Sequence, residues 1–209
     1  MRERDEASNH LKRVCPLMRR AVPRVGPFTL EPQSRRQPYE SLIRAVAHQQ
    51  LHGKAAETIL GRFEALYPGV KFPSPEQVRA THPKKLRGVG FSEAKVRSIL
   101  DIAHKTLEGV VPTRAALTRL DDESIVERLT EVRGVGRWTV EMLLIFQLGR
   151  PDVLPVDDFG VRHGFAVLQR SATFPTPKEL RAYGARWAPH RTAAAWYLWR
   201  VADASRAKK

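Results

Sequence analysis

The sequence contains only one cysteine, Cys15, among its 209 residues. A single cysteine excludes an internal disulfide, a zinc site built from Cys-x-x-Cys pairs and a four-cysteine iron–sulfur cluster. The seven histidines include no His-Glu-x-x-His motif, so no catalytic metal is expected. A chain that forms no disulfide is expected in the cytoplasm.

Long apolar runs and acidic residues are also scarce. No stretch of even about 15 residues is apolar enough for a signal peptide or a transmembrane helix, so no membrane association is expected. Lys and Arg number 36 against 22 Asp and Glu, which gives a net charge of +14 and a pI near 10.6. Such a charge suits a polyanion, and nucleic acid is the first candidate. A basic surface kept for solubility is the alternative.

Apolar residues recur with helical spacing along most of the chain. Leu42, Ile43, Val46 and Ala47 form one stripe, and a second follows within residues 56–67. Alternating apolar stretches, which would indicate strands, are scarce. The sequence therefore predicts an all-α fold.

Two helix starts carry a complete capping sequence. Ser74 and Thr176 are each followed by proline and, three residues after the cap, by Gln77 and Glu179. This spacing predicts two capping boxes. Residues 1–36, by contrast, are rich in arginine and interrupted by prolines, and we expect a short helix and an irregular arm there.

A five-residue glycine motif occurs twice, at residues 86–90 and 132–136. Chance and an ancient duplication explain two copies equally well. Glycines between two helices allow positive φ and close approach of a ligand, and the next helix start favours phosphate. A plain bend between helices is the competing interpretation, whereas a dinucleotide site is excluded because no strand precedes the motif.

Two adjacent carboxylates, Asp157 and Asp158, stand at the start of a helix about twenty residues after the second motif. Taken alone, either residue is best interpreted as a helix cap. Their place after a glycine hairpin and a long apolar helix at residues 139–148 favours a catalytic role.

This order of features resembles the helix-hairpin-helix DNA glycosylases. Residues 134–139, 154–158 and 187–191, together with Trp199, are similar to the 3-methyladenine DNA glycosylase II branch. The resemblance runs from about residue 38 to residue 199. It implies two helical lobes with an active-site cleft between them, one at 38–150 with the hairpin at about 125–148, the other combining 1–37 with 151–209.

The resemblance places the family's catalytic carboxylate at Asp158 and leaves Asp157 as a cap or a supporting group. One carboxylate suffices chemically because an alkylated purine is already cationic and leaves without protonation, while the anion stabilises the oxocarbenium character of the sugar. Trp138 stands where lyase relatives have a nucleophilic lysine, so no lyase activity is expected.

Three side chains are expected around the damaged base. Trp138 and Trp199 resemble the aromatic walls of the alkyl-base pocket, where a π face attracts a cationic base. Met142 stands where some relatives have an aromatic residue, which leaves the substrate range open. Core packing is the competing interpretation for every tryptophan, and it is favoured for Trp187 and Trp196.

The resemblance also implies DNA contacts, because a base must be extruded from the duplex and replaced by a wedge side chain. The wedge candidates are Gln50 and Leu51, and a polar helix end on the surface of the domain is the competing interpretation. The backbone carbonyls of Thr130, Val132 and Val135 would hold a structural Na⁺ or K⁺. The expected DNA contacts of the hairpin come from Gly134, Gly136, Arg137 and Thr139.

The sequence therefore predicts a monomeric, monofunctional glycosylase that hydrolyses the N-glycosidic bond of alkylated purines in double-stranded DNA. A non-catalytic hairpin protein that binds DNA structure or damage is the alternative. Only the first hypothesis has a use for a carboxylate aimed at a polyanion, so Asp158 distinguishes the two.

Overall fold

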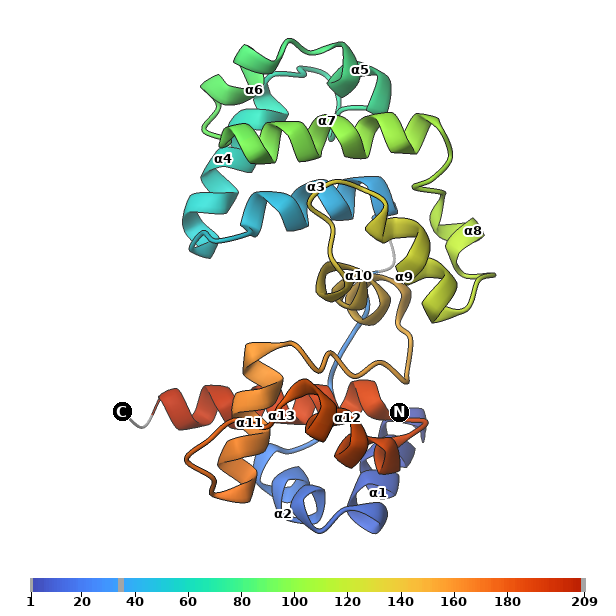
Figure 1. Cartoon of the computed structure of the whole chain (residues 1–209), viewed down its shortest axis with the longest axis vertical. Helices are drawn as coiled ribbons and strands as arrows, with labels where there is room; N and C mark the ends of the chain where they lie inside the picture. Colours follow the sequence, from blue (N-terminus) through green and yellow to red (C-terminus); the bar gives the residue numbers. More distant parts are fainter. Residues whose placement is uncertain (1, 34–35, 208–209) are drawn as a thin grey trace. The chain divides into compact units, whose positions relative to one another are not determined.

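The computed structural model describes residues 2–33 and 36–207, and within these residues all regular secondary structure is helical. The prediction of an all-α fold is confirmed. The chain divides into two compact units, Met1–Pro32 with Leu144–Lys209, and Gln33–Leu143. We call them the terminal unit and the middle unit (Figure 1).

The middle unit is built around α7, which lies alongside α3 and also packs on α5 (Figure 1). The predicted stripe on α3 faces this packing, since Leu42, Ile43, Val46 and Ala47 are all buried. The helices of the unit are α3 (Pro38–His48), α4 (Gly53–Ala65), α5 (Pro75–Ala80), α6 (Pro83–Gly88), α7 (Glu93–Leu107), α8 (Arg114–Leu117), α9 (Asp122–Thr130) and α10 (Arg137–Leu143).

The terminal unit has α13 at its centre, with α11 and α2 packed against it. Gly164 of α11 allows a very close approach, because a Cβ atom there would lie 2.0 Å from the carbonyl oxygen of Leu198. The helices are α1 (Arg2–Val14), α2 (Pro16–Val25), the π-helix η1 (Leu144–Leu148), α11 (Phe159–Gln169), α12 (Pro177–Gly184), the 3₁₀ turn η2 (Ala185–Trp187) and α13 (Arg191–Arg206).

The prediction of an irregular N-terminal arm is wrong for residues 16–25. These residues form α2, which begins with Pro16 in its first turn and contains Pro23. Proline at a helix start lacks only an N–H that would have no helical partner, so Pro16 starts a helix rather than preventing one. Met18 and Ala21 of α2 are buried, and this packing stabilises the helix beyond its local preference.

Both predicted capping boxes are present. Ser74 Oγ accepts from the Gln77 N–H at 3.3 Å, and the Gln77 side chain accepts from the Ser74 N–H at 2.8 Å. Thr176 and Glu179 exchange the same pair of hydrogen bonds at the start of α12. Residues close in sequence therefore formed the local structure that their chemistry favours.

No helix in the part of the chain that the structure describes is long and apolar enough to cross a bilayer.

Candidate active site and DNA-binding hairpin

Asp158 lies at the start of α11 and is half-buried. Its Oδ1 accepts two hydrogen bonds, from the Val161 N–H at 2.8 Å and from the indole Nε1–H of Trp199 at 2.7 Å. Asp158 is therefore the helix cap as well as the predicted catalytic residue. Of the two roles left to Asp157, that of the cap is wrong, and that of a supporting group stays a prediction. Two donors on one oxygen, one of them from α13, hold the carboxylate in a single orientation.

The Asp158–Trp199 contact depends on Gly160 and Phe146. A Cβ atom on Gly160 would lie 2.8 Å from Trp199 Cδ1 and 3.2 Å from Asp158 Oδ1, so only glycine leaves room. Trp199 also stacks on Phe146, with ring centroids 5.5 Å apart and planes 25° apart. Both neighbours restrict the indole to an orientation in which its N–H points at the carboxylate.

Phe146 was missed in the analysis of the sequence. It lies in η1, the π-helical continuation of α10, where the wider turn changes the direction of the side chains. The available signal was an aromatic residue inside the apolar helix expected at residues 139–148. Met142 itself is half-buried on α10.

An ion pair and a hydroxyl group hold the segment that leads to Asp158. Arg191 pairs with both oxygens of Asp152, at 2.7 and 2.8 Å. Burial alone would raise the pKa of Asp152, but the hydrogen bonds and charge of Arg191 lower it below the usual value. The buried Thr192 hydroxyl donates to the Arg150 carbonyl and accepts from the Val153 N–H. The start of α13 thus anchors residues 150–153.

The second glycine motif forms the turn between α9 and α10. Gly134 has φ +76°, and a Cβ atom there would lie 2.4 Å from Ser98 Oγ of α7. The Arg133 N–H donates to Asp101 Oδ2, also on α7, at 2.7 Å. Glycine is needed at Gly134 for both its backbone angle and its close packing, whereas Gly136 is exposed and has no neighbour within 4 Å of such an atom.

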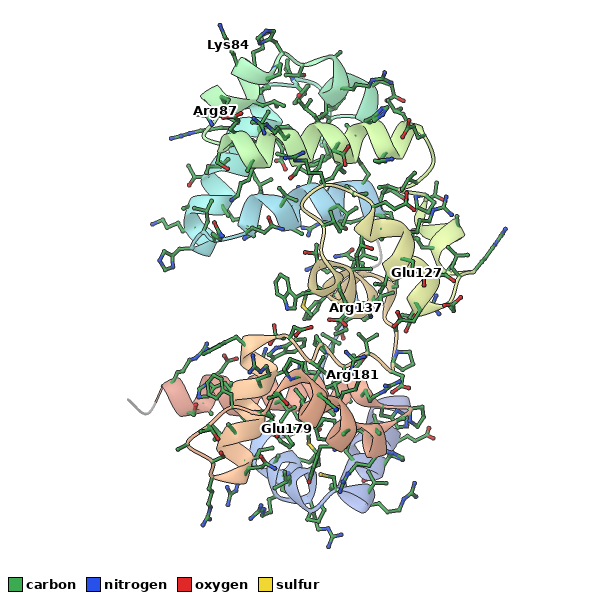
Figure 2. The ribbon with its side chains drawn as sticks, in the orientation of Figure 1. Lys84, Arg87, Glu127, Arg137, Glu179 and Arg181 are labelled. Atoms are coloured by element: carbon green, nitrogen blue, oxygen red, sulfur yellow. The ribbon has the colours of Figure 1, made fainter. Side chains whose placement is uncertain are left out.

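The first glycine motif adopts a different backbone conformation. Here the second glycine, Gly90, has positive φ, at +115°, and its N–H donates to the Arg87 carbonyl at 3.0 Å. Ser92 then caps α7 by accepting from the Lys95 N–H. The two motifs share the residues Arg-Gly-Val-Gly but not a turn. Lys84 and Arg87, on α6, extend outward (Figure 2).

The other predicted DNA-contacting residues of the hairpin differ in exposure. The Arg137 guanidinium forms a two-point ion pair with Glu123, at 3.0 and 2.6 Å, and is 40% exposed. A phosphate at this position would therefore compete with the Glu123 carboxylate. Thr139 is only 5% exposed, so its side chain belongs to the packing of the middle unit and does not line the surface.

The tryptophans differ in burial, and the two for which the sequence favours core packing are the buried ones. Trp187 is fully buried and Trp196 is 7% exposed, which confirms their place in the core. Trp138, on α10, is 44% exposed and is therefore not a core residue. An exposed indole is available to stack on a ligand.

The wedge candidates occupy the turn between α3 and α4. Gln50 is exposed and has φ +58°, a left-handed conformation that is uncommon for a residue other than glycine. Leu51 is 39% exposed. Exposure of a leucine at the tip of a turn fits a side chain that enters a partner rather than its own core.

The carbonyls expected to hold a monovalent cation lie at the end of α9 and in the hairpin. The last carbonyls of a helix have no partner within the helix, which leaves Thr130 O suited to bind a cation. Val132 O accepts from the Val135 N–H at 3.1 Å and retains a second lone pair. Among the described residues no group of three His, Cys, Asp or Glu side chains could hold a metal ion. The cation remains a prediction.

Three comparisons place the chain among known proteins. The profile described as "HhH-GPD superfamily base excision DNA repair protein" matches residues 43–190. DNA-3-methyladenine glycosylase 1 of Schizosaccharomyces pombe is 44% identical over 94% of this chain and 86% of its own length. A solved structure of 3-methyladenine DNA glycosylase from that organism, in complex with abasic DNA, superposes with a TM-score of 0.85.

That structure is 44% identical and covers 93% of this chain and 95% of its own. The DNA-3-methyladenine glycosidase of Bacillus halodurans is 31% identical, with a TM-score of 0.84 over 95% of this chain and 91% of its own. This chain is similar to both relatives, in sequence and in structure, over nearly their whole length. The chain therefore belongs to the HhH-GPD superfamily of base excision DNA repair proteins.

Proposed function

We propose that this protein is a DNA-3-methyladenine glycosylase, which hydrolyses the N-glycosidic bond of alkylated purines in double-stranded DNA and leaves an abasic site. The observation that carries the proposal is the Asp158 carboxylate, held by Trp199 Nε1–H at 2.7 Å next to the start of α11. In a protein that only bound DNA, a carboxylate oriented in this way would have no role, because a negative charge repels the phosphates.

The chemistry requires one anion and an extruded base. As the bond to the cationic purine breaks, its electron pair goes to the base, which leaves neutral, and positive charge develops on the deoxyribose. The Asp158 carboxylate stabilises that charge, and a water molecule adds to C1′ and passes its proton to the carboxylate or to solvent. Because Trp138 occupies the position of the lyase lysine, the product is an abasic site and not a broken strand.

The other exposed residues that the sequence predicts are assigned to binding, and Thr139, which is buried, is not among them. In the terminal unit Trp199 stacks on Phe146, and in the middle unit Trp138 is exposed. Each unit thus presents an aromatic face, and such a face attracts a cationic base by about 0.5–2 kcal/mol. The hairpin after α9 binds a phosphate through the backbone around Gly134 and Gly136. The carbonyls of Thr130, Val132 and Val135 would hold a Na⁺ or K⁺, which would neutralise phosphate charge there.

Base release from a methylated duplex tests the function directly. The enzyme in excess over DNA should release 3-methyladenine and 7-methylguanine, detected by chromatography, with strand breaks only after alkali or heat. An unmethylated duplex of the same sequence is the control and should yield no free base. Binding without release would favour the non-catalytic DNA-binding protein, and strand breaks without alkali would contradict the assignment of Trp138.

Trp199→Phe tests whether the indole N–H orients Asp158. The substitution keeps an aromatic ring against Phe146 but removes the donor to Asp158 Oδ1. Hydrogen bonds to charged groups contribute about 1.5–3 kcal/mol, so we expect single-turnover release to slow at least about tenfold, with little change in duplex affinity.

The control for this prediction is Trp196→Phe, which changes a tryptophan of the same helix whose contacts are within the core. It should lower thermal stability and leave the rate of the folded enzyme nearly unchanged. If Trp199→Phe weakened DNA binding as much as it slowed release, Trp199 would be a wall of the base pocket only, without an orienting role.

A further inference from the structure

Gln49, which the sequence analysis did not single out, connects two predicted DNA-binding elements of the middle unit. Its side-chain Nε2–H donates to the carbonyl oxygen of Gly134 at 3.0 Å, across 85 residues of sequence. Gly134 is the left-handed glycine of the hairpin, and Gln49 immediately precedes the wedge candidates Gln50 and Leu51. One side chain thus joins the wedge turn to the hairpin.

One face of helix α7 contacts the end of α3, which leads into the wedge turn, and also contacts the hairpin. Its Lys95 Nζ donates to the Ala47 carbonyl at 2.8 Å, in the last turn of α3. Three residues later Ser98 packs against Gly134, and Asp101 accepts from the Arg133 N–H at 2.7 Å. Residues 95, 98 and 101 recur at intervals of three, so they share a face of the helix. This face supports the wedge turn and the hairpin at the same time.

The turn itself is closed by local contacts, among them His48 Nε2, which lies 3.0 Å from Glu57 Oε1 on the other side of the turn. Leu51 N–H donates to His48 O at 3.2 Å, and the backbone at Gln50 is held in the left-handed region. A non-glycine residue with positive φ persists only where its surroundings impose it, at a cost that the contacts around it must offset. The Gln49–Gly134 and Lys95–Ala47 hydrogen bonds are long-range contacts just before Gln50, and they hold the segment that enters this left-handed turn.

We propose that Gln49, assisted by Lys95, is a positioning residue for base extrusion: it holds the wedge turn at a set distance from the phosphate-binding hairpin. The inference rests on the proposed function and adds to it a specific role. When the hairpin binds the phosphate backbone of a duplex, the Gln49–Gly134 hydrogen bond places Leu51 and Gln50 at the gap that the extruded base leaves. A misplacement of the order of 1 Å at such a position costs far more in rate than in affinity.

This role predicts a dependence on base pairing that a purely structural hydrogen bond would not produce. Extrusion costs most when the damaged base is stacked and paired, and least when it is unpaired. Weakening the connection should therefore slow release from a paired lesion and spare an unpaired one. A general loss of stability would slow both substrates equally or only reduce the amount of folded enzyme.

The test uses two duplexes of identical sequence, with 7-methylguanine opposite either cytosine or an abasic site. Under single-turnover conditions Gln49→Ala should slow release about tenfold on the paired duplex and about twofold or less on the unpaired one. Gln49→Glu keeps the length of the side chain but presents a carboxylate to the Gly134 carbonyl, so it should show the same pattern. Gln169→Ala, an exposed glutamine on α11, is the matched control and should behave as wild type on both duplexes.

Lys95→Met provides a second approach, since it removes the contact with Ala47 and leaves Gln49 intact. It should also slow the paired substrate selectively, and fluorescence of 2-aminopurine beside the lesion should report less extrusion in both variants. For Gln49→Ala and Gln49→Glu, the rate on each duplex is divided by the wild-type rate on the same duplex. If this ratio is the same for both duplexes, whether unchanged or equally reduced, the inference is overturned. Failure of the wild type to release base from either duplex would instead overturn the proposed function.

Discussion

Asp158→Asn is expected to lower the single-turnover rate of alkylbase release by about a thousandfold. Asparagine retains an Oδ1 acceptor for both the Val161 N–H and the Trp199 Nε1–H, so the start of α11 and the orientation of Trp199 should persist. What the substitution removes is the negative charge that stabilises the developing oxocarbenium ion.

Duplex affinity should be unchanged or higher in the same variant, because an anion directed at DNA is lost. The affinity of wild type and variant for an abasic duplex, measured at one salt concentration, checks this part of the prediction. Asp157→Asn is the matched control: it removes an exposed carboxylate one residue earlier and should retain nearly the full rate. Unimpaired release by Asp158→Asn would exclude Asp158 as the catalytic residue.

Gly164→Ala is expected to lower the free energy of unfolding by about 3 kcal/mol. The new methyl group would lie 2.0 Å from the Leu198 carbonyl oxygen and 3.0 Å from its Cα atom. Both obstacles are backbone atoms, so α11 and α13 must move apart, and no change of rotamer can relieve the contact. Since Asp158 and Trp199 lie on these two helices, the same movement should also slow base release.

Urea unfolding followed by circular dichroism measures this effect, with Gly61→Ala as the control. Gly61 lies inside α4 with open space around it and no positive φ. Alanine there should be neutral or stabilise the protein by up to about 1 kcal/mol, because it has the higher helix propensity. Equal unfolding midpoints for the two variants would contradict the close packing of α11 on α13.

Features that depend on neighbours a few residues away could be predicted from the sequence. The all-α fold, the buried stripe on α3 and both capping boxes follow from helical periodicity and from hydrogen bonds over three residues. Family membership could also be predicted, because the order of hairpin, apolar helix and paired carboxylates survives in the sequence itself. Local preference failed at α2, where the burial of Met18 and Ala21 outweighs its prolines.

Contacts between distant residues were decided only by the tertiary structure. Trp199 reaches Asp158 across 41 residues, Gln49 reaches Gly134 across 85, and these pairs determine which carboxylate is oriented and how the wedge turn is held. The two copies of the glycine motif likewise differ in their packing, since Gly134 packs against Ser98 of α7 and Gly90 against Ile59 of α4. Such contacts depend on how whole helices pack, and a hydrogen-bonding side chain has many partners within reach until that packing selects one.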